Sequence, residues 1–252
     1  MIKQRTGTHF VNSGWQVSIY GNKTIPIGPD WKADFSTLLN KFKNPDSILK
    51  HDNRSDVGTF KIGGLRYVIK KFTFQSTNTW LRLTSVFFPT QGEIACRNSL
   101  EMASVGINTP QPALLMQRTR GKVVANSWLV YRFVEGQPLT KDNTEDIVEF
   151  VKNMHRSGWI HRDPHPGNFI STPEGIITID PIKARQTNNH YLKAYDVVLM
   201  EHDMPAARDI YGRNELGRWF TYAKAGHALL KFYRSLKYSI RRLLGIYGNR
   251  TG

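Results

Sequence analysis

The chain has 252 residues, 40% of them hydrophobic and 12% aromatic, and its 35 Lys and Arg against 20 Asp and Glu give a formal charge of +15. This composition excludes a disordered chain and provides enough apolar side chains for a substantial core. The single cysteine, Cys96, excludes an internal disulfide framework, and no segment reaches the roughly 18 to 20 apolar residues of a membrane span. The charge favours anionic partners without choosing among nucleic acid, phosphorylated substrates and acidic lipid.

The first part of the chain is predicted to be rich in strands. Alternating apolar residues predict a hairpin over residues 10–27, broken at Gly21 and Asn22, and helical spacing predicts a helix over residues 31–42. Three further strands are expected, at residues 47–50, 57–62 and 65–72. Gly63 and Gly64 separate the last two and suit the tight turn of a hairpin.

One helix and one buried strand complete this part. Helical spacing extends over residues 91–105 and stops at Gly106, which is a common way for a helix to end. Residues 128–133 are continuously apolar apart from Arg132 and predict a buried strand. The strand-rich part ends near residues 136–139.

The rest of the chain is predicted to be mainly helical. Asp142 and Glu145 have the spacing of a capping box at the start of its first helix. We therefore divide the chain into three parts: an N-terminal extension (residues 1–46) packed on a β-rich lobe, that lobe with its one helix (47–136), and a helical lobe (137–252).

The strongest chemical signal is a polar loop that begins at His161 and presents Asp163, then Asn168, before a β-branched strand that ends at Asp180. Phosphoryl transfer needs an oriented acceptor hydroxyl and metal ions on the phosphates, and carboxylate and amide oxygens suit both tasks. Two other interpretations stay open. The loop's Asp and Asn could cap turns, or His161 and His165 could bind zinc, although no further His or Cys nearby completes a zinc site.

A second signal lies upstream, where Lys70 is placed towards the end of the predicted strand over residues 65–72. A strand lysine that pairs with ATP phosphates is a feature of kinases. Its expected partner is a glutamate on the following helix, for which we choose Glu93, with Glu101 as the alternative. An ordinary solvated lysine is the competing interpretation.

Two common kinase features are missing from the sequence. The turn over residues 51–56, which would cover the phosphates, has no glycine, so Arg54, Ser55 and backbone N–H groups would have to bind them. Asp180 is followed by Pro181 and not by Phe-Gly, which argues against a switchable activation segment.

With these residues in place, the chain resembles the bacterial lipopolysaccharide core heptose kinases, particularly the heptose II kinase type, within the protein-kinase-like group. The resemblance extends along most of the chain. Five segments carry it: the strand-lysine segment 67–72, the hinge 133–136, the catalytic loop 163–170, the metal-binding Asp180, and Asp196 on the helix that follows.

The resemblance implies an α+β, protein-kinase-like, two-lobed fold and a role for each matching residue. Asp163 would be the catalytic base, with His161 in the same catalytic group, and Asp196 would brace the loop. Asn168 and Asp180 would hold Mg²⁺. The ATP-binding residues would be Lys70, Glu93, Arg132, Phe133 and Val134, although Arg132 stands where related kinases usually carry Glu.

The implied activity is ATP-dependent phosphorylation of a heptose hydroxyl in the lipopolysaccharide inner core, with heptose II favoured over heptose I. The implied partner is the lipid A–core oligosaccharide, and the expected location is the cytoplasm, peripherally at the cytoplasmic face of the inner membrane. Two alternatives remain: a phosphotransferase of the aminoglycoside-kinase type, and a non-catalytic kinase-like anion-binding protein. No recognised nucleic-acid motif is present, so we expect no nucleic-acid partner.

The C-terminal segment carries no acidic residue after Glu215. On a helix, its apolar residues fall on one side and its Lys and Arg residues on the other. This basic amphipathic helix suits an anionic membrane surface. The other interpretation is that its apolar face docks on the helical lobe.

Overall fold

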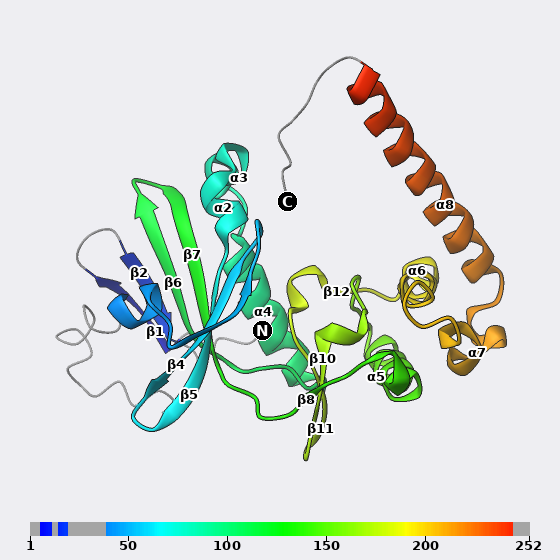
Figure 1. Ribbon diagram of the computed structural model, residues 1–252, viewed down its shortest axis with the longest axis horizontal. Helices are drawn as coiled ribbons and strands as arrows, with labels where there is room; N and C mark the ends of the chain where they lie inside the picture. The colour runs from blue at the N-terminus through cyan, green and yellow to red at the C-terminus, as the bar shows by residue number, and fades with distance from the viewer. Residues whose placement is uncertain (1–5, 12–14, 20–38, 244–252) are drawn as a thin grey trace. The chain divides into compact units, whose positions relative to one another are not determined.

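The computed structural model describes residues 6–11, 15–19 and 39–243 of the chain. The chain divides into two compact units: unit 1 comprises Met1–Gln137 and Ile170–Lys183, and unit 2 comprises Pro138–Phe169 and Ala184–Gly252. Figure 1 shows their elements. Within the described ranges, no helix is both long and apolar enough to cross a membrane.

Unit 1 is built on a seven-stranded sheet in the order β1-β2-β6-β7-β5-β4-β3, and every pair of neighbours is antiparallel. Its strands are β1 (Thr6–Val11), β2 (Trp15–Ile19), β3 (Ser47–His51), β4 (Asp56–Ile62), β5 (Leu65–Lys71), β6 (Pro112–Arg120) and β7 (Val123–Arg132). The expected β4–β5 hairpin is confirmed, since Ile62 pairs with Leu65 and the glycines between them have φ of 57° and 78°. These positive φ values are what a primed two-residue turn requires.

Core side chains pack on both faces of the central strands of this sheet, since successive side chains of a strand point to opposite faces. Leu114 and Val130 belong to one core cluster, with aromatic residues such as Phe60. Their neighbours Leu115 and Leu129 belong to a second cluster, formed with helix α4 (Gln91–Ser104). In β5, Ile69 lies in the first cluster, so the adjacent Lys70 points to the face that α4 covers.

Helix α4 begins at a capping box in which Thr90 and Glu93 bond each other's backbone N–H groups. The helix ends before Gly106, whose φ is 83°, as the sequence predicted. Two short helices that the sequence analysis did not identify, α2 (Thr73–Thr77) and α3 (Thr79–Thr84), lie between β5 and α4. They contact the first part of β7 (Figure 1).

A second, three-stranded sheet has the order β11-β10-β8. Its strands are β8 (Gln137–Pro138), β10 (Phe169–Thr172) and β11 (Gly175–Thr178), and the division between the units passes through β8 and β10. The single turn η3 (Pro181–Lys183) follows Asp180 and contacts α4 within unit 1.

Unit 2 is mainly helical. Its helices are α5 (Thr144–Arg156), α6 (His190–Met200), α7 (Ala207–Tyr211) and α8 (Arg213–Leu243), preceded by the turn η1 (Lys141–Asn143). Strands β9 (Trp159–Ile160) and β12 (Arg185–Gln186) pair, and the turn η2 (Pro166–Asn168) closes the loop after β9. Helix α8 packs on α6, and Gly217, with φ 49° and ψ −140°, breaks its first turns.

The predicted α+β class, with a β-rich part followed by a mainly helical part, is confirmed. The capping box expected from Asp142 and Glu145 is wrong: Thr140 and Asn143 form it, one 3₁₀ turn earlier, because that turn precedes α5. Of the helix expected over residues 31–42, only residues 39–42 lie in the described ranges, and they are helical. The break at Gly21 and Asn22 lies outside those ranges.

Replacing Gly92 with Ala tests the packing of α4 on β7. A Cβ at this position would overlap Ser127 Oγ and come within 2.8 Å of Leu115 Cδ1. We expect a loss of about 1–3 kcal/mol in the free energy of unfolding, measured by urea denaturation, despite a helix-propensity gain of about 1 kcal/mol. The control Arg97→Ala, at an exposed position of α4, should change it by less than about 0.5 kcal/mol. A Gly92→Ala protein as stable as this control would contradict the packing.

Candidate active site

A buried carboxylate holds the loop that presents Asp163. Asp196, on α6, accepts a hydrogen bond from the backbone N–H of His161 at 2.6 Å and another from that of Arg162 at 2.8 Å. Its side chain is 1% exposed. Bonds from N–H groups to a charged acceptor are stronger than neutral ones, so the start of the loop is fixed to α6.

The backbone turns sharply just before Asp163. Arg162 has φ of 65°, a conformation that costs about 1–3 kcal/mol in a residue other than glycine and persists only where the surroundings impose it. The bond from its N–H to Asp196 is one such constraint. On the other side, the Asp163 carbonyl accepts bonds from His165 N at 2.9 Å and from Asn168 Nδ2 at 2.8 Å. The loop therefore holds Asp163 from both directions.

Asp196 is itself oriented by two buried residues that the sequence analysis did not single out. Its Oδ2 lies 3.2 Å from His155 Nε2, and His155 Nδ1 lies 2.8 Å from the Tyr211 hydroxyl. A carboxylate can only accept, so His155 Nε2 carries a hydrogen, and in the neutral ring Nδ1 accepts from Tyr211. Burial, reinforced by Glu215, raises the pKa of Tyr211 to about 12, so this phenol keeps its proton.

The catalytic assignment of His161 needs correction. Its side chain is 0% exposed, and its ring lies 5.3 Å from that of Phe169. A side chain enclosed in this way packs the interior of the loop and does not reach a substrate. His161 therefore belongs with Asp196 among the residues that position Asp163.

Unit 1 brings together the two other predicted residues, Lys70 and Asp180. Lys70 Nζ lies 2.7 Å from Asp180 Oδ1, with side chains 13% and 34% exposed respectively. The ammonium also lies 5.6 Å from the centre of the Phe72 ring. The lysine of strand β5 and the carboxylate after β11 thus meet at a partly shielded site.

The segment around Asp180 is constrained as tightly as the loop of unit 2. Asp180 has φ of 59°, and within residues 6–11, 15–19 and 39–243 only it and Arg162 have positive φ without being glycine. Buried Asn98 of α4 donates from Nδ2 to the Pro181 carbonyl at 2.8 Å. Burial and the charge of Asp180 raise the pKa of Tyr131, so the phenol beside this carboxylate stays neutral.

The predicted pairing of Lys70 with Glu93 is wrong in this structure. The Glu93 carboxylate accepts from Thr90 N at 2.7 Å and serves as the cap of α4, while Lys70 pairs with Asp180. The alternative, Glu101, forms no ion pair with Lys70 either. A glutamate at the third position of a helix whose N-cap is Thr is already committed to that cap.

The predicted adenine-binding segment follows β7. Arg132 is exposed and is the last residue of the strand, paired with Tyr67. Phe133 donates from its backbone N–H to the Arg66 carbonyl at 2.9 Å, and the Arg66 guanidinium lies 3.9 Å above its ring. Within residues 6–11, 15–19 and 39–243, the N–H and carbonyl of the next residue, Val134, make no backbone hydrogen bond.

In the turn over residues 51–56, two of the backbone N–H groups that were expected to bind phosphate have a partner within the turn. The Asp52 carboxylate accepts the backbone N–H of Arg54 at 2.8 Å and that of Ser55 at 2.7 Å, and it pairs with Lys50 at 2.9 Å. These N–H groups are therefore occupied within the turn. Asp is common in turns because its side chain can bond the backbone two residues on.

Among the residues with described positions, no group of three or more His, Cys, Asp and Glu is arranged to hold a metal ion. The hard oxygens at hand are the Asp180 carboxylate in unit 1 and the Asn168 amide in unit 2. Because Asn168 Nδ2 donates to Asp163, the amide is fixed with its oxygen directed away from that bond.

No protein-family model matches the chain, and no curated protein matches it. The chain does align with solved structures. "WaaP in complex with acyl carrier protein" aligns at a TM-score of 0.45 and 14% identity, over 84% of this chain and 96% of that one. A mutant PknI kinase domain of Mycobacterium tuberculosis aligns at a TM-score of 0.42 and 15% identity, over 69% of this chain and 85% of that one. We rest the functional proposal on the chain's own residues.

Truncating Asp196 should destabilise unit 2. In Asp196→Ala, His155 and two backbone N–H groups lose their partner, and we expect the free energy of unfolding to fall by about 3–5 kcal/mol, measured by urea denaturation. Asp196→Asn keeps one acceptor oxygen and should lose less. Equal stability of wild type and both variants would show that the carboxylate does not hold the loop.

The Asp52 turn predicts an unusual acid titration. Burial raises the pKa of Asp52, but the bond from Lys50 and the N–H groups of Ser55 and Arg54 outweigh it and lower the pKa to about 2. The folded pKa lies below the unfolded value of about 3.9, so the contribution to stability is complete above pH about 4 and lost as pH falls through 2. The amide chemical shifts of Arg54 and Ser55 should report this pKa in an NMR titration. Lys50→Met should move it towards 4, and a wild-type midpoint already near 4 would refute the assignment.

Proposed function

We propose that this chain is an ATP-dependent phosphotransferase and that its acceptor is a heptose hydroxyl of the lipopolysaccharide inner core. The observation that carries the proposal is the ion pair between Lys70 and Asp180 at 2.7 Å. These residues lie far apart in the sequence. Two separate sequence signals predicted one as the phosphate-binding lysine and the other as the metal-binding carboxylate.

ATP would be bound mainly by unit 1. Lys70 suits the phosphates as a shielded point charge. The backbone groups of Val134, which bond no backbone group among the described residues, suit the adenine edge. We propose Asp180 and Asn168 as Mg²⁺ ligands, because carboxylate and amide oxygens are the hard ligands that this ion prefers. A bound Mg²⁺ would neutralise charge on the phosphates.

Asp163 is suited to accept the proton of the attacking hydroxyl. Its side chain is half-buried, and the residues on both sides of it are fixed by the bonds to Asp196 and Asn168. A general base must be held at hydrogen-bond distance from the proton it takes, and a fixed backbone serves that need. The strained Arg162 conformation supports this role, because such strain clusters at functional sites.

The heptose acceptor rests on the resemblance of residues 133–136 and 163–170 to the core heptose kinases, and we keep heptose II as the preferred ring. The charge of +15 supports an anionic acceptor such as a phosphorylated lipid A–core oligosaccharide. It disfavours a cationic aminoglycoside, which would need an acidic cleft. On this proposal the enzyme works in the cytoplasm, peripherally at the inner membrane.

Helix α8 supports that location. Residues 228–240 are all exposed, and they include large apolar side chains as well as Lys231, Arg234 and Lys237. The exposed apolar side chains are Leu229, Leu230, Phe232, Tyr233, Leu236, Tyr238 and Ile240. This part of the apolar face is not docked on the rest of unit 2, so we propose that it meets an anionic membrane.

Removing the base tests the reaction. Asp163→Ala should lower phosphoryl transfer by about 10² to 10⁴-fold, while ATP affinity, measured by calorimetry, stays near the wild-type value. Asp146→Ala, at an exposed position of α5, is the matched control and should transfer normally. Near-normal transfer by the Asp163 variant would refute the assignment.

The acceptor is tested separately. Mass spectrometry of core oligosaccharide from cells with and without the gene should show the loss of one phosphate, and fragmentation should place it on a heptose. Unchanged core phosphate, with ATP turnover retained by the purified protein, would point to a different small-molecule acceptor.

A further inference from the structure

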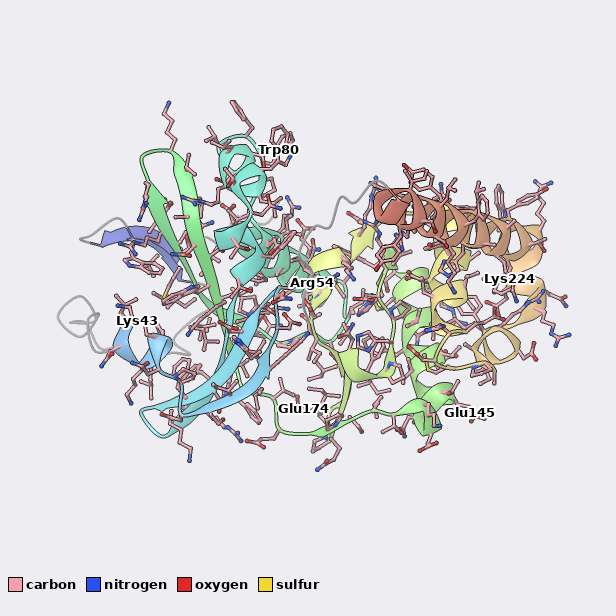
Figure 2. All side chains as sticks on the ribbon, turned by 45° about the horizontal axis from the view of Figure 1, so that its top comes forward. Lys43, Arg54, Trp80, Glu145, Glu174 and Lys224 are labelled. Atoms are coloured by element: carbon pink, nitrogen blue, oxygen red, sulfur yellow. The ribbon has the colours of Figure 1, made fainter. Side chains whose placement is uncertain are left out.

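A group of large apolar side chains in unit 1 is exposed on α3 and the segment that follows it. Trp80 is 72% exposed, Leu83 56%, Phe87 83% and Phe88 65%, and α3 has no buried residue. We call these four residues the aromatic patch. Figure 2 shows Trp80 at the outer end of α3. A contiguous exposed apolar patch of this kind marks an interaction site.

The patch is held in place by polar bonds, so its exposure is a property of an ordered segment. The Asn78 side chain caps α3 by accepting the Leu81 N–H at 3.1 Å. At the other end, Ser85 Oγ donates to the Arg82 carbonyl at 2.5 Å and accepts the Val124 N–H at 2.9 Å. Both ends of α3 are thus tied by polar bonds, and the side chains of Trp80 and Leu83 on it are exposed.

The bond from Val124 to Ser85 also places the patch beside a basic hairpin tip. Val124 lies near the start of β7, just after the β6–β7 turn, and α3 contacts β7. This tip exposes three cations, Arg118, Arg120 and Lys122. No acidic residue occurs between Asp56 and Glu93, or between Glu101 and Glu135. The aromatic patch therefore has a rim of positive charge without nearby acidic residues in its own segments.

We propose that the aromatic patch inserts into an anionic lipid surface while the cations of the β6–β7 tip bind its headgroups. Trp and Phe beside Lys and Arg are the combination that interfacial membrane segments use. A basic side chain near an anionic leaflet contributes about 1 kcal/mol. A bilayer accepts exposed apolar side chains without a matching groove. This site is on unit 1, distinct from α8, and does not depend on the proposed reaction.

The first test is sedimentation of the full-length chain with vesicles of phosphatidylglycerol and phosphatidylethanolamine. Replacing both Phe87 and Phe88 with Ser should lower the partition coefficient by roughly 10- to 100-fold. Arg120→Gln and Lys122→Gln should each lower it by about fivefold. The matched control replaces Ile48 and Leu49, exposed apolar residues of the edge strand β3, with Ser and should bind like the wild type.

The second test locates Trp80 directly. Vesicles containing brominated acyl chains quench tryptophans that enter the bilayer. Quenching should fall clearly in Trp80→Phe, whereas Trp15→Phe, which removes a buried tryptophan, should leave it unchanged. Trp219→Phe, on α8, separates any contribution of that helix.

Three results would overturn the proposal. One is wild-type affinity of the Phe87/Phe88 variant for anionic vesicles, which would mean that α8 and not the aromatic patch binds the membrane. Another is equal binding to neutral phosphatidylcholine vesicles. The third is lipid-free self-association, measured by analytical ultracentrifugation, that the same variant abolishes, since the patch would then be a contact between copies of this chain. None of these measurements uses ATP or an acceptor, so they are independent of the kinase proposal.

Discussion

The candidate catalytic loop depends on the hydrogen bonds that the Asp196 carboxylate accepts from its backbone. This carboxylate is enclosed in unit 2, where it accepts two backbone N–H groups and the His155 ring. A buried carboxylate is costly unless it is fully hydrogen-bonded, and here the bonds that satisfy it also impose the left-handed turn at Arg162. The same bonds thus stabilise the interior and position Asp163.

In unit 1, different contacts hold the Asp180 segment in place. Lys70 and Asp180 neutralise each other at the sheet face covered by α4, and Asn98 fixes the backbone immediately after Asp180. In both units, a side chain from a helix holds a strained, non-glycine residue in place. The strain is local, whereas the groups that maintain it come from distant parts of the sequence.

Much of this could be predicted from the sequence. Strong periodicity gave strands β4 and β5, helix α4 and the helical character of unit 2. Lys70 and Asp180 were identified because each lies near the end of a predicted strand. Strand β6 was not identified because apolar and polar residues do not alternate clearly along it. Helices α2 and α3 are too short for a periodic signal.

The site was less predictable where side chains had competing partners. Glu93 matched the expected lysine partner, but Thr90 three residues earlier is the sequence signal of a cap. Asp52 could likewise have been identified as a turn residue that occupies nearby N–H groups. His155 and Tyr211 gave no signal at all, because their bond joins residues that only the packing of α5 and α7 brings together.

The His227 ring of helix α8 bonds the Tyr195 hydroxyl at 3.0 Å, and residues 228–240 beyond it are all exposed. Beyond His227, sixteen residues run to Leu243, an arm of about 24 Å at 1.5 Å per residue. A helix of that length without tertiary contacts is only marginally stable in water. The order of this arm is therefore coupled to its partner, because any surface that binds it as a helix also shifts its helix–coil equilibrium.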